Sequence, residues 1–288
     1  MVLFHHFLTL YKNNKMYIFS NYIEKERWEK EFSDLSHLEF SLFYDYRPTY
    51  DELILSPINI FIACEPNEYF GNHDFAIQNQ SAFSFILTWS SKILNNADNS
   101  MFSVYGESWW QDTPYEYQFT KKEFKVSFLR GSLLKLIGHS YRYELYDRQN
   151  EIKTPIQFWD KLGERGGEFT KWRQDKIDTF RPYQYSVCIE NSSHENYFTE
   201  KITDCILNKT IPIYYGCSNI GSFYNDKGII QVKNTDEIIK VINNLNPDYY
   251  DGILDVIEEN YQRAFEYKNY VGNIKKQIFE IFKINNLI

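Results

Sequence analysis

Residues 185–216 read Tyr-Ser-Val-Cys-Ile-Glu-Asn-Ser-Ser-His-Glu-Asn-Tyr-Phe-Thr-Glu-Lys-Ile-Thr-Asp-Cys-Ile-Leu-Asn-Lys-Thr-Ile-Pro-Ile-Tyr-Tyr-Gly, and they decide the fold. Residues 185–190 form an apolar run with a polar end, as is typical of a buried strand. Thr199 opens a helix that carries apolar residues at helical spacing, Ile202, Cys205 and Ile206. Residues 211–215, rich in β-branched and aromatic side chains, predict the next strand. This order forms a βαβ unit, which joins parallel strands.

The loop and the first helical turn of this unit carry residues that can bind a ligand. Open α/β sheets bind ligands outside the carboxyl ends of their strands, where this unit places Glu190, Asn191, Ser192, Tyr197, Glu200 and Lys201. The free N–H groups of a helix start, together with Lys201, favour a phosphate. Asn191 and Glu200 can bind sugar or ribose hydroxyls. The stretch therefore predicts a site for a phosphorylated, hydroxyl-rich ligand such as a nucleotide sugar.

The same residues resemble the donor-binding motif of the α1,3/4-fucosyltransferases, glycosyltransferase family 10. The ungapped match comprises Glu190-Asn191-Ser192, Tyr197-Phe198-Thr199-Glu200-Lys201, Thr210-Ile211-Pro212-Ile213 and Gly216. The resemblance implies a GT-B-like α/β fold, with two Rossmann-like domains facing each other across a cleft. It also implies that fucose moves from GDP-fucose to a glycan hydroxyl, with Glu190, Asn191, Ser192, Tyr197, Thr199, Glu200 and Lys201 binding the donor. Two simpler roles stay open: Glu200 stabilises the helix dipole, and Tyr197 is a core aromatic.

A chain of 288 residues has the size at which a single core tends to split into two. We expect an acceptor-side domain at residues 1–118 and a donor-binding domain with terminal helices at residues 119–288. The change to aromatic and charged residues at 114–125 marks the linker. A second α/β unit starts at residues 125–128, and Leu133, Leu134 and Ile137 predict a helical apolar stripe after it. Residues 147–180 are polar and predict a long loop or an insertion.

Charge and cysteine usage limit the partners of the chain. The net charge of −8 lacks the basic footprint of a nucleic-acid binder. A membrane-spanning helix needs about 18 consecutive apolar residues, and no run in the chain reaches this length. We therefore expect a soluble cytoplasmic protein that resembles the bacterial or viral members of the family. Peripheral attachment to a membrane is left open. The four cysteines form no Cys-x-x-Cys pair and predict free thiols in a reducing compartment. The oligomeric state, the acceptor and the linkage are not predicted.

The first domain offers a carboxylate at a strand end. Its predicted strands cover residues 16–19, 58–64 and 85–89, and the second ends at Glu65-Pro66. In the resembled family a Glu in a similar position is the catalytic base, and the run 74–77 resembles the family's Asp-Tyr-Ala-Ile. Pro66 departs from the Asn or Ser that often follows this Glu. We therefore predict Glu65 as the base, with Glu68, Asp74 and Glu107 as rivals.

Sugar transfer from a nucleotide diphosphate also needs positive charge on the leaving group. The chain contains no Asp-x-Asp motif, so we expect no metal and no cofactor, and Lys or Arg must supply this charge. Lys201 is the first cation. Arg130 ends the predicted strand 126–129 and opens a helix, where the resembled family has an arginine that contacts the diphosphate; a surface role is the alternative. Direct attack by the acceptor predicts inversion. The alternative functions are a related transferase with another nucleotide sugar, and a non-catalytic carbohydrate- or nucleotide-binding protein.

Overall fold

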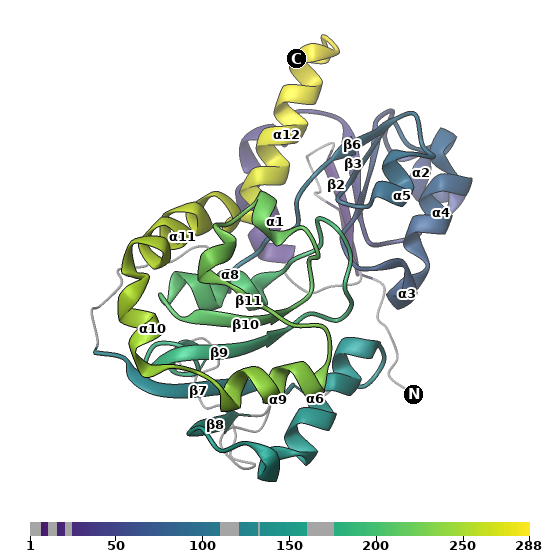
Figure 1. Cartoon of the computed structure of the whole chain (residues 1–288). Helices are drawn as coiled ribbons and strands as arrows, with labels where there is room; N and C mark the ends of the chain where they lie inside the picture. The colour runs from purple at the N-terminus through teal and green to yellow at the C-terminus, as the bar shows by residue number, and fades with distance from the viewer. Residues whose placement is uncertain (1–6, 11–15, 21–24, 110–120, 132, 160–175) are drawn as a thin grey trace. The chain divides into compact units, whose positions relative to one another are not determined.

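The computed structural model describes residues 7–10, 16–20, 25–109, 121–131, 133–159 and 176–288. These residues belong to two compact units (Figure 1). The first unit comprises residues 1–105 and 271–288, and the second comprises residues 106–270. The predicted domain boundary at 118/119 lies outside the described residues. No described helix has both the length and the apolar character that a membrane span requires.

The first unit is built on a sheet with the strand order β1-β2-β3-β4-β5-β6. The strands are β1 Phe7–Leu10, β2 Met16–Ser20, β3 Phe40–Tyr44, β4 Asn59–Ala63, β5 Phe85–Thr88 and β6 Ser100–Phe102. β1 pairs antiparallel with β2, and the other neighbouring strands are parallel. Every residue of β3 and β4 is buried, as expected for parallel strands that are covered on both faces.

Short helices surround this sheet: α1 Lys25–Glu31, α2 Tyr50–Leu53, α3 Asn67–Phe70, α4 Asn72–Gln78 and α5 Ser91–Leu94. Phe19, Phe43, Phe61 and Phe83 form much of the core. The last helix, α12 Tyr270–Ile284, supplies Phe282, whose ring packs edge-on against Phe40 with the centroids 5.3 Å apart. Helix α12 therefore packs against β3 of the first unit.

The second unit is built on a parallel sheet with the order β11-β10-β9-β7-β8. The strands are β7 Glu123–Leu129, β8 Ile156–Trp159, β9 Tyr183–Ile189, β10 Ile211–Tyr215 and β11 Ile230–Gln231. The chain adds β8 on one side of β7 and then β9 on the other side. The strand order thus reverses between β7 and β9, and such a switch point is where open α/β sheets bind ligands.

Helices cover both faces of this second sheet: α6 Ile137–Asp147, α8 Glu200–Leu207, α9 Thr235–Asn243, α10 Pro247–Gly252 and α11 Leu254–Tyr267 (Figure 1). Alternation along β9 assigns the faces. Tyr185 and Val187 pack in the cluster that also contains Leu145 of α6 and Ile238 of α9. The thiol of Cys188 points the other way and contacts Cys205 of α8. All four cysteines are buried and free.

The βαβ prediction is confirmed: β9, α8 and β10 follow in order, and Ile211 pairs with Tyr185 in parallel register. The prediction of a helical apolar stripe formed by Leu133, Leu134 and Ile137 is wrong. Leu133 and Leu134 precede α6 and are 55% and 66% exposed, whereas the buried face of α6 begins at Gly138. The loop predicted at 147–180 contains strand β8, and its residues 160–175 lie outside the described residues.

Candidate functional site

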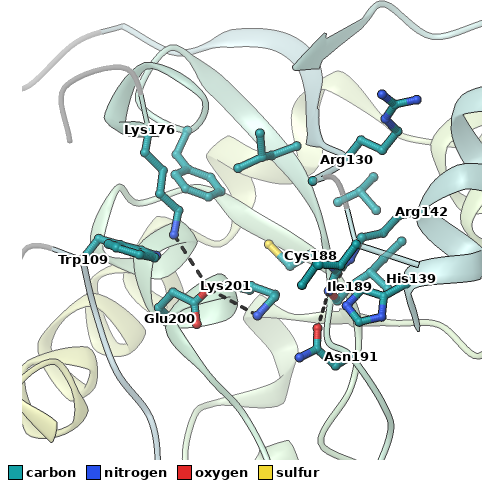
Figure 2. A pocket seen from close by; sticks show the side chains of 15 residues that line it. Trp109, Arg130, His139, Arg142, Lys176, Cys188, Ile189, Asn191, Glu200 and Lys201 are labelled. Carbon is teal, nitrogen blue, oxygen red and sulfur yellow. Dashed lines mark hydrogen bonds and ion pairs between the residues drawn. The ribbon is translucent and has the colours of Figure 1, made fainter. Parts of the chain in front are cut away.

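A pocket of about 410 Å³ lies in the second unit, where β7 and β9 end (Figure 2). The segment after β7 supplies Arg130, and the segment after β9 supplies Asn191. Helix α8 supplies Glu200 and Lys201 from its first turn. The full lining is Trp109, Leu129, Arg130, Gly131, Leu133, His139, Arg142, Lys176, Phe180, Val187, Cys188, Ile189, Asn191, Glu200 and Lys201. The sheet therefore places this pocket at its topological switch point.

Glu190 joins the end of β9 to the start of α8 and does not line the pocket. Its carboxylate is fully buried and accepts hydrogen bonds from the Thr199 N–H at 2.9 Å and the Thr199 hydroxyl at 2.7 Å. Thr199 is the N-cap residue of α8, so Glu190 fixes the N-terminus of this helix. In the structure both residues hold the N-terminus of α8. Their predicted donor-binding roles remain predictions.

Lys201 lies among oxygen atoms in the pocket. Its Nζ is 3.0 Å from Thr199 Oγ1, 3.2 Å from Glu200 Oε1 and 3.4 Å from Glu190 Oε2. Burial opposes ionisation of Glu200, but Lys201 and Lys176 outweigh it and lower the pKa of this carboxyl to about 2. Glu200 is therefore ionised at neutral pH and can only accept hydrogen bonds. The first turn of α8 therefore combines a cation with an ionised acceptor.

Arg142 brings a second cation to the end of β9. It projects from α6, is only 8% exposed, and donates through Nε to the Ile189 carbonyl at 3.1 Å and through Nη2 to Asn191 Oδ1 at 3.1 Å. One turn earlier, His139 accepts the Leu136 N–H on Nδ1 at 2.9 Å. Burial, with Arg142 and Lys201 nearby, lowers the pKa of His139 to about 4, so the imidazole is neutral and carries its proton on Nε2.

Gly138 makes this arrangement possible. Its N–H donates to the Asn191 carbonyl at 3.0 Å, which brings the start of α6 against the loop after β9. A Cβ at this position would lie 1.8 Å from the Glu190 carbonyl oxygen and 2.9 Å from that of Asn191. Only glycine allows this close approach, and the approach carries Arg142 and His139 to the pocket.

Three other predicted site residues occupy different positions. Arg130 lines the pocket but opens no helix, because α6 begins only at Ile137. Its guanidinium lies over the rings of Tyr143 at 4.9 Å and Tyr146 at 4.4 Å and points away from Lys201 in Figure 2. Ser192 and Tyr197 are buried and do not line the pocket. Their binding roles stay predictions.

Glu65 follows β4 in the first unit, as predicted. Its N–H donates to Asp45 Oδ2 at 2.9 Å, and the Cys64 N–H donates to Asp45 Oδ1 at 3.1 Å. Burial, and secondly the charge of Glu65, raises the pKa of Asp45 to about 7. The rival Asp74 is engaged by Lys92, in an ion pair of 2.5 Å, and by the side chain of Asn67 at 2.7 Å. Asp45 thus holds the turn that presents Glu65.

Among the pocket residues that sequence reasoning missed are Trp109, His139, Arg142 and Lys176. A usable signal existed for two of them. His139 and Arg142 share the buried face of α6 with Gly138 and Leu145, and an arginine on the inner stripe of a helix is rarely buried without a partner. Trp109 and Lys176 border the segments 110–120 and 160–175 and carried no such periodic signal.

The fold and the pocket define a class, the α/β proteins with an open, largely parallel sheet and a pocket at the switch point of its strand order. Residues 134–283 match the family model "Glycosyltransferase family 10 (fucosyltransferase) C-term". This match covers the pocket helices and more than half of the chain, so the chain belongs to glycosyltransferase family 10. The resemblance seen in the donor motif is confirmed.

Curated relatives include an α-(1,3)-fucosyltransferase of Helicobacter pylori, 33% identical over 147 residues, which are 49% of this chain and 30% of that protein. An α-(1,4)-fucosyltransferase of Arabidopsis thaliana is 20% identical over 197 residues, which are 66% of this chain and 47% of that protein. The matched stretches thus span less than half of either relative.

Solved structures share the fold. A crystal structure of an α1,3-fucosyltransferase with GDP matches this chain with a TM-score of 0.58 at 19% sequence identity. The match covers 96% of this chain and 91% of the fucosyltransferase chain. A second α1,3-fucosyltransferase structure has a TM-score of 0.55 at 17% identity, with 90% and 89% covered. The GT-B-like fold class that the sequence predicted is confirmed.

Proposed function

We propose that the chain transfers fucose from GDP-fucose to a hydroxyl of a glycan acceptor. One observation carries this proposal: the part of the chain that matches the family builds a pocket that holds Lys201 and Arg142 beside the N-terminus of α8. Two cations and a helix N-terminus suit a diphosphate. The ionised Glu200 suits the hydroxyls of a sugar or ribose.

The leaving group is the first requirement of the reaction. As the bond between the anomeric carbon and the diphosphate oxygen breaks, negative charge grows on GDP. Lys201 is placed to neutralise it, since Lys201 lines the pocket in the first turn of α8. Arg142 adds a charge that deprotonation does not remove. We propose that these side chains replace a divalent metal ion and that the reaction needs none.

The acceptor supplies the second half of the reaction. Its hydroxyl oxygen attacks the anomeric carbon on the face opposite the diphosphate, so the new bond forms with inversion. The hydroxyl proton must leave to a general base, and we propose Glu65 for this role. The fixed backbone of Glu65, bonded to Asp45, would keep its position constant between turnovers.

Calorimetric titration with GDP, UDP, ADP and CDP in metal-free buffer tests the donor. Selective binding of GDP, followed by turnover of GDP-fucose, is the expected result. Preference for another nucleotide would favour a related transferase that uses a different sugar donor. Failure to bind any of the four would leave a non-catalytic protein as the better description.

Glu65→Gln separates an enzyme from a binding protein. We expect turnover to fall by about 100-fold or more, the usual size of a general-base effect, with GDP affinity unchanged. Glu68→Gln tests the rival base in the helix that follows, and a loss of turnover there but not in Glu65→Gln would assign the base role to Glu68. Equal turnover in the parent and in Glu65→Gln would remove Glu65 from the base role.

A further inference from the structure

A buried carboxylate lies behind Glu200 on the same face of α8. Asp204 follows Glu200 by one helical turn and is fully buried. Its Oδ1 accepts the Ser108 hydroxyl at 2.7 Å and the Trp109 N–H at 3.2 Å. Its Oδ2 pairs with Lys176 Nζ at 2.7 Å. Asp204 therefore ties two separate segments of the pocket wall to α8.

Lys176 connects this anchor to the pocket. Its side chain is 6% exposed, and its Nζ lies 4.0 Å from Glu200 Oε1 and 4.9 Å from the centre of the Trp109 ring. In Figure 2 Lys176 and Trp109 lie on the opposite side of the view from Arg142 and His139. The charges alternate from Asp204 through Lys176, Glu200 and Lys201 to Glu190, with separations of 2.7, 4.0, 3.2 and 3.4 Å.

In this row of alternating charges, Lys176 can hold the Glu200 carboxylate when a bound phosphate occupies Lys201. In the structure Lys201 is shared between Glu190, Glu200 and Thr199. A phosphate bound to Lys201 would compete for the same ammonium group and weaken its hold on Glu200. Lys176 would remain as the second cation beside Glu200, because Asp204 fixes it from the far side. Opposite charges in a low-dielectric site interact strongly enough to set the carboxylate's orientation.

We propose that Lys176, anchored by Asp204, is a positioning residue that holds the Glu200 carboxylate toward the hydroxyl groups of the nucleotide-sugar donor. This inference rests on the proposed donor-binding function. It adds to the donor motif two residues whose role is exerted through Glu200.

A double-mutant cycle on GDP affinity tests this role. Lys176→Met alone would leave Asp204 buried and unpaired, which is strongly destabilising. The combined variant Lys176→Met/Asp204→Asn removes both charges, and its amide oxygen still accepts from Ser108 and Trp109. We expect it to bind GDP about tenfold more weakly, within the usual coupling of residues in one network. In a Glu200→Gln background the same pair of changes should alter the affinity by less than about twofold.

The control uses an ion pair at the other end of α8, outside the pocket. Lys209→Met/Glu258→Gln removes a 2.6 Å pair beyond the C-terminal end of α8 and should leave GDP affinity unchanged. Thermal unfolding checks that each variant is folded. An equal loss of affinity in both backgrounds would mean that Lys176 supports the fold only, and would overturn the inference.

A second measurement does not depend on the donor. In the parent protein Glu200 Oε1 lies 3.2 Å from Lys201 and 4.0 Å from Lys176. In a crystal structure of the Lys176→Met/Asp204→Asn variant, the Glu200 carboxylate should move away from the side chain at position 176. An unchanged Glu200 orientation would overturn the inference. If the parent protein binds none of GDP, UDP, ADP and CDP, the proposed function fails, whereas this structure still decides whether Lys176 positions Glu200.

Discussion

Replacement of Lys201 by Ala is the most direct test of the pocket. The Lys201 Nζ lies within 3.4 Å of three oxygen atoms, at the helix end where we place the diphosphate. A charge-assisted hydrogen bond is worth roughly 1.5–3 kcal/mol, which corresponds to a loss of about 10- to 150-fold in GDP affinity. Guanosine has no phosphate, so its affinity should change little.

Stability must be followed in the same experiment. Lys201 also faces Glu190, which is fully buried, and removal of one partner of a buried pair costs roughly 3–5 kcal/mol. The double variant Lys201→Met/Glu190→Gln removes both charges and should recover most of that loss without recovering GDP affinity. Calorimetry with GDP and guanosine, below the unfolding temperature of each variant, separates the two effects.

The control for Lys201→Ala is Lys209→Ala. Lys209 pairs with Glu258 beyond the other end of α8, so its removal should leave GDP affinity unchanged. The reasoning would be refuted if Lys201→Ala bound GDP as tightly as the parent. It would also be refuted if GDP and guanosine lost affinity equally, because the loss would then not come from the phosphates.

Three further outcomes are expected. Gly138→Ala places a Cβ 1.8 Å from the Glu190 carbonyl oxygen and should lower the free energy of unfolding, measured in urea, by about 2–3 kcal/mol. The control Gly252→Ala, with no atom within 4 Å of its Cβ, should leave it unchanged. Equal unfolding midpoints for the two variants would contradict the close packing of α6. Folding lowers the pKa of His139 from its ordinary value of 6.5 to about 4, so between pH 6.5 and pH 4 this imidazole is protonated in the unfolded chain but not in the folded one. The free energy of unfolding should therefore fall as the pH falls through that window. His139→Gln should lose this part of the pH dependence, and an unchanged pH dependence would assign it to other groups. GDP binding and turnover should survive EDTA, and a loss that Mg²⁺ or Mn²⁺ restores would refute the metal-independent mechanism.

Local sequence determined the βαβ unit that carries the donor motif. A short apolar run, a segment with apolar residues at helical spacing and a run rich in β-branched and aromatic residues follow one another, and Thr199 caps the helix as its side-chain chemistry favours. The strand that ends before Glu65 was readable for the same reason. These signals depend on neighbours in the chain, so they need no knowledge of the fold. The resemblance to the family could be seen in the sequence because the motif residues lie within this single unit.

Tertiary structure decided which side chains face the pocket. Arg142 meets Asn191 from a helix that lies 49 positions earlier in the chain, and Gly138 allows that meeting. Glu190 belongs to the motif, yet its carboxylate turns to Thr199 and Lys201. The row from Asp204 to Glu190 joins residues from separate segments. Such contacts depend on the distance between folded elements, which the period of a single segment does not encode.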